Sequence, residues 1–219
     1  MLRILIVDDR EDPRTTLREW IEANLPKGAQ IEIDDTFPLE DIRAYASYIR
    51  EHDIAALLLD ERLHEQGNPK TGVRVTYYGH DVVGHLRAAL PDFPVYVVTT
   101  YSGDADLKSK EGEFEDVVDR DDFMKSPQMY TSRIQRAAMR FREAMQEHLN
   151  SLSELTLKAA QGNLTEQDHR KLVSTREVLG LPFSADSTLV VSDLIAGARD
   201  LAAKSEELIQ RIKNGSGKK

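Results

Sequence analysis

Four polar residues whose types could do chemistry follow apolar stretches of the chain. Asp8 and Asp9 come directly after one such stretch, Asp60 after a second and Thr99 after a third. Carboxylates that meet at one place raise one another's proton affinity, and Mg²⁺, which prefers oxygen ligands, relieves that repulsion. A metal there neutralises phosphoryl oxygens, and a carboxylate beside it can act as a nucleophile. The four residues therefore indicate a site for phosphoryl transfer.

The stretches before these residues have the character of buried parallel strands, because they are short, apolar and bounded by polar residues. Helical patterns separate them, which predicts βαβ units and an α/β fold with a doubly wound parallel sheet of five strands. The expected strands are 2–7, 30–33, 54–59, 94–98 and a weaker one at 115–120. Ligands bind at the carboxyl ends of such strands, so neighbouring strands would bring the four residues together.

The expected helices of this sheet follow apolar residues that recur every three or four positions. They are centred on 17–25, 42–49 and 81–90. Two polar stretches, 65–79 and 101–112, are predicted to be loops, the second with only a short helix.

The stretch 130–160 contains no proline or glycine and predicts one long helix. Apolar and small residues recur along it in a heptad pattern of modest quality. The members of that pattern are Ala138, Phe141, Met145, His148, Leu152, Leu155 and Ala159. Two interpretations stay open: a helix packed on its own domain, and a helix that forms a homodimer.

The rest of the chain predicts further helices. Thr165 and Asp168 have the spacing of a helix start, and a last helix is expected at about 192–212. We therefore divide the chain into a domain at 1–145 and an all-helical output or dimerisation segment at 146–213. A flexible tail follows at 214–219.

The composition of the chain bears on its binding partners and on its location in the cell. The net charge is -9, yet residues 147–219 hold ten basic and ten acidic residues, so residues 1–146 carry the whole deficit. An acidic domain disfavours binding to nucleic acid. No apolar run reaches the roughly 18 residues of a membrane span. With no cysteine and no layout of a signal peptide, we expect a cytoplasmic protein.

Several motifs resemble those of bacterial two-component response-regulator receivers, the CheY-like domains. Residues 2–9 resemble their first strand with its paired acids, and 57–60 resemble their phosphoacceptor strand. Residues 94–100 resemble their fourth strand with its switch hydroxyl, and 79–83 resemble the start of their third helix. The resemblance covers about 1–145 and implies a flavodoxin-like receiver fold.

The resemblance implies a role for each matching residue. Asp60 would accept the phosphoryl group, and Thr99 would bond it once bound. Mg²⁺ would be held by Asp8, Asp9, Asp60 and the backbone carbonyl of Arg62. The phosphoryl group would come from a histidine kinase or a phosphotransfer protein.

The sequence departs from the receiver pattern in three places. The family's lysine at the end of strand five is absent, and Arg120 has the best spacing to replace it, with Lys125 as the alternative. Val117 stands where an aromatic switch residue is usual. The loop after Asp60 is longer than usual, and His64 stands in it where proline is common. Arginine is a good phosphate partner, although its fork is larger than an ammonium group.

These observations favour a response regulator of a two-component phosphorelay that signals through its helical C-terminal segment by protein–protein contact. It would not be an enzyme, apart from slow self-dephosphorylation. The alternatives are a degenerate receiver that docks partners without phosphorylation, and a DNA-binding transcriptional regulator with an atypical C-terminal domain. A haloacid-dehalogenase-like phosphatase is disfavoured, because Arg62 stands where that family needs an acid.

The remaining histidines are predicted to be solvated, because they lie in stretches rich in charge. They are His52, His80, His85, His148 and His169.

Overall fold

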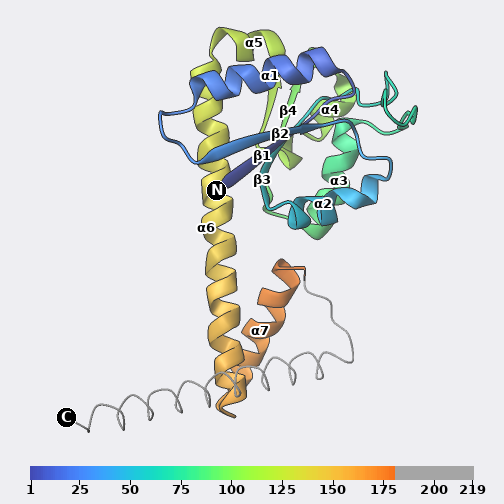
Figure 1. Ribbon diagram of the computed structural model, residues 1–219. Coiled ribbons are helices and arrows are strands. Elements are labelled where there is room, and N and C mark those ends of the chain that lie inside the picture. The colour runs from blue at the N-terminus through green and yellow to red at the C-terminus, as the bar shows by residue number, and fades with distance from the viewer. Residues whose placement is uncertain (181–219) are drawn as a thin grey trace, which may run out of the picture. The chain divides into compact units, whose positions relative to one another are not determined.

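The computed structural model describes residues 1–180 (Figure 1). The helix predicted at 192–212 and the tail predicted at 214–219 lie outside the described residues, as does the end of the segment 146–213. The chain divides into a compact unit at Met1–Glu143 and a second unit that begins at Ala144.

A five-stranded parallel sheet with the strand order β2-β1-β3-β4-β5 forms the centre of the first unit. Its strands are β1 (Leu2–Val7), β2 (Ile31–Thr36), β3 (Ile54–Leu59), β4 (Val95–Thr99) and β5 (Asp116–Asp119). This order is that of doubly wound, flavodoxin-like folds, which confirms the predicted fold class.

The register of the sheet brings the carboxyl ends of the central strands to one edge. Val7 at the end of β1 pairs with Leu59 at the end of β3, and Leu59 pairs with Val97 of β4. The residues after Val7 and Leu59 therefore leave the sheet side by side, and Thr99 ends the next strand. This alignment places the predicted chemistry in one region.

Helices cover both faces of the sheet (Figure 1). The described helices of the chain are α1 (Glu11–Asn24), η1 (Ile42–Ala44), α2 (Tyr45–Glu51), α3 (Gly79–Ala89), α4 (Ala105–Ser109), η2 (Glu111–Glu113), α5 (Arg120–Lys125), α6 (Pro127–Ala160) and α7 (Glu166–Val178). On one face, α1, α5 and the first turns of α6 bury Ile21, Phe123 and Ile134 against the sheet. On the other face, α2 and α3 bury residues such as Tyr45 and Leu86.

Two predicted strands differ from the structure in their bounds. Strand β2 extends to Thr36 rather than ending at residue 33, although its last residues are polar. It is an edge strand, and Asp35 near its end pairs with Arg14 of α1 at 2.7 Å. Charged residues suit such an edge, which explains why apolar periodicity underestimated the strand. The fifth strand is shorter than predicted, because helix α5 begins at Arg120.

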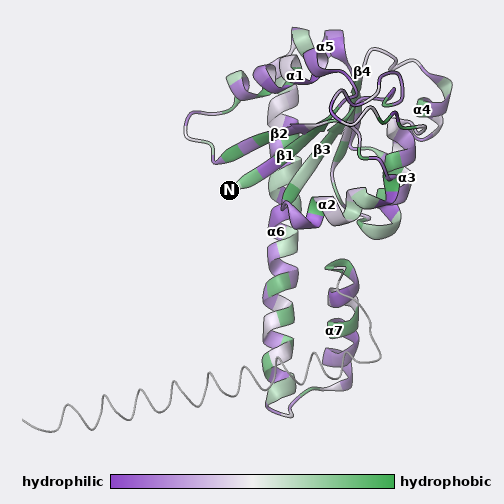
Figure 2. Ribbon diagram, turned by 45° about the vertical axis from the view of Figure 1, so that its right-hand side comes forward, coloured by the Kyte–Doolittle hydropathy of each residue, from purple (hydrophilic) through white to green (hydrophobic). Residues whose placement is uncertain are grey.

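The second unit contains the end of α6 and helix α7. Thr165 caps α7 by accepting from the backbone of Asp168, whose side chain bonds back to Thr165, as the sequence spacing predicted. Lys158 of α6 pairs with Asp168 at 2.8 Å, and Leu155 is buried. Figure 2 shows green apolar positions on α6 and α7 mixed with purple polar ones.

The heptad pattern of α6 is divided between the two units. Ala138 is fully buried in the core of the first unit, where Phe141 packs beside it. This part of the pattern packs on its own domain, as one of the two interpretations held, and a homodimer through 130–160 stays a prediction. Among the described residues, no helix is both long and apolar enough to cross a membrane.

Candidate functional site

Three buried carboxylates meet at the carboxyl edge of the sheet. Asp8, Asp9 and Asp60 each contribute an oxygen to a group whose atoms all lie within 4.8 Å of one another. Each of these residues is at most 3% exposed. The sheet register causes this meeting, because Asp60 follows β3 and its backbone N–H donates to Val7 O at 2.9 Å. The convergence expected from the sequence is therefore present.

Local backbone bonds orient two of these carboxylates. The backbone N–H of Arg10 donates to Asp8 Oδ1 at 2.9 Å. The backbone N–H of Arg62 donates to Asp60 Oδ2 at 3.1 Å. Each aspartate thus accepts from the residue two positions later, a turn for which aspartate is well suited. The two side chains are held in fixed orientations at the edge of the sheet.

Arg120 is the cation that the structure brings to these acids. Its Nη2 contacts Asp8 Oδ2 and lies 3.2 Å from Asp60 Oδ1, while its Nε donates to Val98 O at 3.2 Å. Lys125, the alternative, lies at the other end of α5 with an exposed side chain and pairs with Asp122 at 2.9 Å. Asp119 caps α5 and turns the chain so that Arg120, its first residue, reaches the site.

The donor set of this site fits a hard divalent cation. Asp9 Oδ1 is buried without a hydrogen-bond partner, which is costly unless a cation or water meets it. Asp60 Oδ1 is also buried without a hydrogen bond, although Arg120 Nη2 lies 3.2 Å away as an ion-pair partner. Carboxylate oxygens are the ligands that Mg²⁺ prefers. The part assigned to the carbonyl of Arg62 stays a prediction, while its backbone N–H is engaged with Asp60.

Burial makes Asp8 and Asp9 resist ionisation. It raises the pKa of Asp8 above its ordinary 3.8, although the guanidinium of Arg120 acts in the opposite direction. Burial also raises the pKa of Asp9, which the backbone N–H of Gln66 partly counteracts. Both groups therefore gain from a second positive charge beyond Arg120.

We expect Mg²⁺ to stabilise the protein more strongly as the pH rises. Acids with a raised folded pKa bind protons more tightly when folded, so their stabilising contribution is complete below pH 3.8 and is lost as pH rises through the folded pKa. Mg²⁺ in large excess should raise the free energy of unfolding by about 2 kcal/mol at pH ~7 and by much less at pH ~4. Thermal melts with Mg²⁺ or matched NaCl measure this, and equal gains at both pH values would contradict it.

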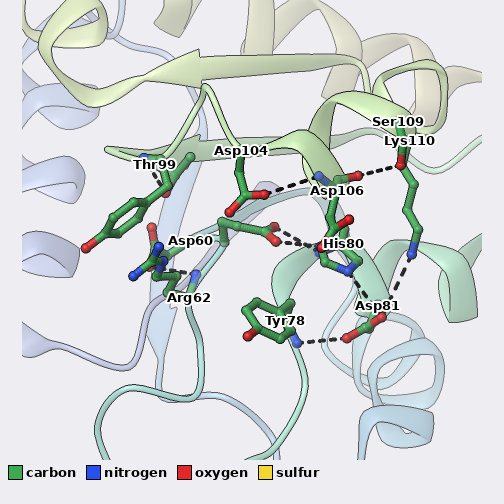
Figure 3. A network of polar contacts seen from close by, with 12 residues as sticks. Asp60, Arg62, Tyr78, His80, Asp81, Thr99, Asp104, Asp106, Ser109 and Lys110 are labelled. Atoms are coloured by element: carbon green, nitrogen blue, oxygen red, sulfur yellow. Dashed lines mark hydrogen bonds and ion pairs between the residues drawn. The ribbon is translucent and has the colours of Figure 1, made fainter.

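Thr99 lies at the end of β4, next to the strand that carries Asp60, as Figure 3 shows. Its side chain is fully buried, and its Oγ1 accepts from the backbone N–H of Tyr101 at 3.3 Å. The Arg62 guanidinium lies 3.4 Å above the centre of the Tyr101 ring. The hydroxyl predicted to bond a phosphoryl group is thus held at the correct edge.

Sequence reasoning missed a buried pair beside Asp60. Glu61 accepts from the backbone N–H of His80 at 3.2 Å, and its other oxygen lies 2.5 Å from His80 Nδ1. The prediction that His80 is solvated is wrong, because α3 begins at Gly79 and directs His80 inward. The absence of a side chain on Gly79 lets helix α3 approach Asp60. The glycine directly before His80 was the sequence signal that could have indicated this close approach and the burial of His80.

The long loop after Asp60 reaches back over the acids. The backbone N–H of Gln66 donates to Asp9 Oδ2 at 2.5 Å. Further along, Asn68 N donates to Val73 O at 2.8 Å, and the rings of His64 and Tyr78 lie 4.3 Å apart. The stretch 65–79 is therefore a structured loop, one of whose backbone groups contacts the predicted metal site.

No protein-family model and no curated protein matches the chain. Several solved structures with a similar fold carry the names of response regulators or their receiver domains. A LuxR-family DNA-binding response regulator from Staphylococcus aureus is 15% identical, covers 63% of this chain and 99% of its own, and has a TM-score of 0.44. The HemR receiver domain from Leptospira biflexa is 18% identical, covers 63% and 94%, and also scores 0.44.

The response regulator TrrA from Thermotoga maritima, solved in complex with Mg²⁺ and BeF, is 20% identical. It covers 61% of this chain and 99% of its own, with a TM-score of 0.43.

Proposed function

We propose that the chain is the response regulator of a two-component phosphorelay and that Asp60 accepts the phosphoryl group. The observation that carries this proposal is the meeting of Asp8, Asp9 and Asp60 with Arg120 at the carboxyl edge of a parallel sheet. Buried acids whose oxygens lack hydrogen-bond partners, beside the guanidinium of Arg120, suit a carboxylate nucleophile that works with Mg²⁺. The donor is a phosphohistidine on a kinase or phosphotransfer protein.

Each residue of the site has a separate role in this reaction. The carboxylate of Asp60 attacks phosphorus; an O–P bond forms and the N–P bond to the donor histidine breaks. The Arg62 backbone holds Asp60 Oδ2, which leaves Oδ1 directed toward Arg120. Thr99 binds a phosphoryl oxygen, and so does the guanidinium of Arg120 once the negative group has entered the site. Asp8 and Asp9 would hold Mg²⁺, which would neutralise part of the charge of that group. Beyond slow hydrolysis of the aspartyl phosphate, no turnover is expected.

Phosphorylation of Asp60 changes which proteins the helical C-terminal segment contacts. Helix α6 begins in the first unit, where Ile134 and Ala138 belong to the core, and it ends in the second unit. A phosphoryl group adds charge and acceptor oxygens, so it biases the site between two arrangements. We propose that this bias reaches a protein partner of the second unit.

Phosphoryl uptake by the full chain tests the proposal. With acetyl phosphate and Mg²⁺, the protein should gain one phosphoryl group by intact-mass spectrometry, and Asp60→Asn should abolish the gain. Asp122→Asn is the matched control, because Asp122 is exposed and pairs with Lys125 away from the acids. Uptake by Asp60→Asn at the rate of the unchanged protein would refute the role of Asp60.

One observation favours a second candidate, a receiver that docks partners without phosphorylation. Arg120 already compensates part of the charge of Asp8 and Asp60, so the site has a protein cation before any metal arrives. This candidate expects no uptake from acetyl phosphate or from a phosphorylated kinase, and partner binding that is unchanged by Asp60→Asn. The same mass measurement separates the two candidates.

A further inference from the structure

We propose that Arg120 is an internal counterion that must release Asp8 before a divalent cation can bind, and that the pocket beside Trp20 receives the released guanidinium. The inference rests on the metal site of the proposed function. It adds a competition between a side chain of this protein and its metal, and it makes Arg120 a determinant of metal affinity.

The contacts of Arg120 show the conflict. Its Nη2 contacts Asp8 Oδ2, the same carboxylate that would ligate the cation, and it lies 3.2 Å from Asp60 Oδ1. A divalent ion among these oxygens would face a positive charge at close range, in a region where the acids are at most 3% exposed. Charges repel more strongly away from water, so both cations cannot keep the same partners.

Arginine suits this role better than lysine because its fork makes two separate contacts. The Nε of Arg120 donates to Val98 O at 3.2 Å while Nη2 meets Asp8. An ammonium group has three N–H donors but a single nitrogen, so it cannot keep one nitrogen on the carbonyl while another leaves the acid. The bond to Val98 anchors the base of the guanidinium, and the contact with Asp8 is the one that a metal displaces.

The structure provides a place for the displaced group. Arg120 forms part of the wall of a cavity of about 280 Å³ between α1 and the sheet, which Asp12, Thr16 and Trp20 also line. The carboxylate of Asp12 offers a new anionic partner. The Trp20 ring, which stacks with Phe123 at 6.2 Å between ring centroids, lines the same cavity, and a guanidinium that enters it is attracted to the ring. Trp20 is the single tryptophan of the chain, so its fluorescence reports on this cavity.

Mg²⁺ binding by the full-length protein tests the inference. Calorimetric titration with MgCl₂ should give about tenfold tighter binding for Arg120→Gln, the size expected when two linked binding events exclude each other. Mg²⁺ should also change Trp20 emission in the unchanged protein but not in Arg120→Gln, although that variant binds the ion. Arg120→Lys should keep the positive charge, bind Mg²⁺ with intermediate affinity and give no Trp20 change.

Two controls separate displacement from the loss of a nearby charge. Arg10 acts on Asp9 through space, so Arg10→Gln removes a charge close to the same acids. Lys125→Gln removes a charge from the exposed end of α5. An increase in Mg²⁺ affinity in Arg10→Gln as large as that in Arg120→Gln would overturn the inference. Trp20 emission that stays the same when Mg²⁺ binds to the protein without substitutions would also overturn it. Circular dichroism melts check that each variant is folded.

The failure of this inference differs from the failure of the proposed function. In one outcome, Arg120→Gln binds Mg²⁺ tightly and the Trp20 signals are as expected, but the protein without substitutions takes up no phosphoryl group. That outcome refutes the role of Asp60 as phosphoacceptor and supports the role of Arg120 as a counterion. Phosphoryl uptake at Asp60, with equal Mg²⁺ affinity in Arg120→Gln and the unchanged protein, supports the function and refutes the counterion.

Discussion

Gly79→Ala is expected to lower the free energy of unfolding of the first unit by about 3 kcal/mol. A Cβ atom on Gly79 would lie 2.4 Å from the backbone oxygen of Asp60 and 3.2 Å from the Cα of Glu61. Backbone atoms cannot rotate away from such a contact, so α3 and the end of β3 must move apart. The movement would also weaken the bond of 2.8 Å from Gly79 N to Glu61 O.

Urea unfolding followed by circular dichroism measures this loss, and Gly84→Ala is the matched control. Gly84 lies on the same helix, but a Cβ there would meet no atom within 4 Å. Alanine favours the helix, so this control should gain about 0.5–1 kcal/mol. Slower uptake of the phosphoryl group should accompany Gly79→Ala, because the same shift displaces Asp60. Equal unfolding midpoints for the two variants would contradict the steric argument.

His80→Ala is expected to cost about 3 kcal/mol, since it leaves a buried carboxylate without its ring partner. Glu61 is only 2% exposed, and burial raises its pKa while the contact with His80 lowers it. Without the ring, Glu61 Oε2 still accepts the hydrogen bond from the backbone N–H of His80, but Oε1 loses its contact with the imidazole. Breaking a buried pair is costly because one charged partner stays behind.

A double-mutant cycle separates the pair from its surroundings. Glu61→Leu combined with His80→Ala should recover most of the loss, because neither variant residue carries a buried charge. His85→Ala, at an exposed position of the same helix, is the control and should change stability by less than about 0.5 kcal/mol. Additive losses in the cycle would show that Glu61 and His80 act independently.

The apolar and helical patterns of the chain were enough to predict the parallel sheet, and they predicted the meeting of the acids on the condition that their strands are neighbours. Short apolar runs such as 54–59 that alternate with helical patterns indicate buried strands, and this alternation favours a parallel sheet. In such a sheet, neighbouring strands end at one edge, so Asp8 and Asp60 had to come close once β1 and β3 became neighbours. These predictions succeeded because they rest on local periodicity and on a general rule of topology.

The packing of the elements shows which cation reaches the acids and which residues surround them. Spacing left Arg120 and Lys125 open, because the answer depends on where β5 ends and how α5 leaves it. The burial of His80 depends on the approach of α3 to β3, and the bond from Gln66 to Asp9 joins residues 57 positions apart. Contacts between distant segments leave no periodic trace in the sequence, since they arise from the packing of whole elements.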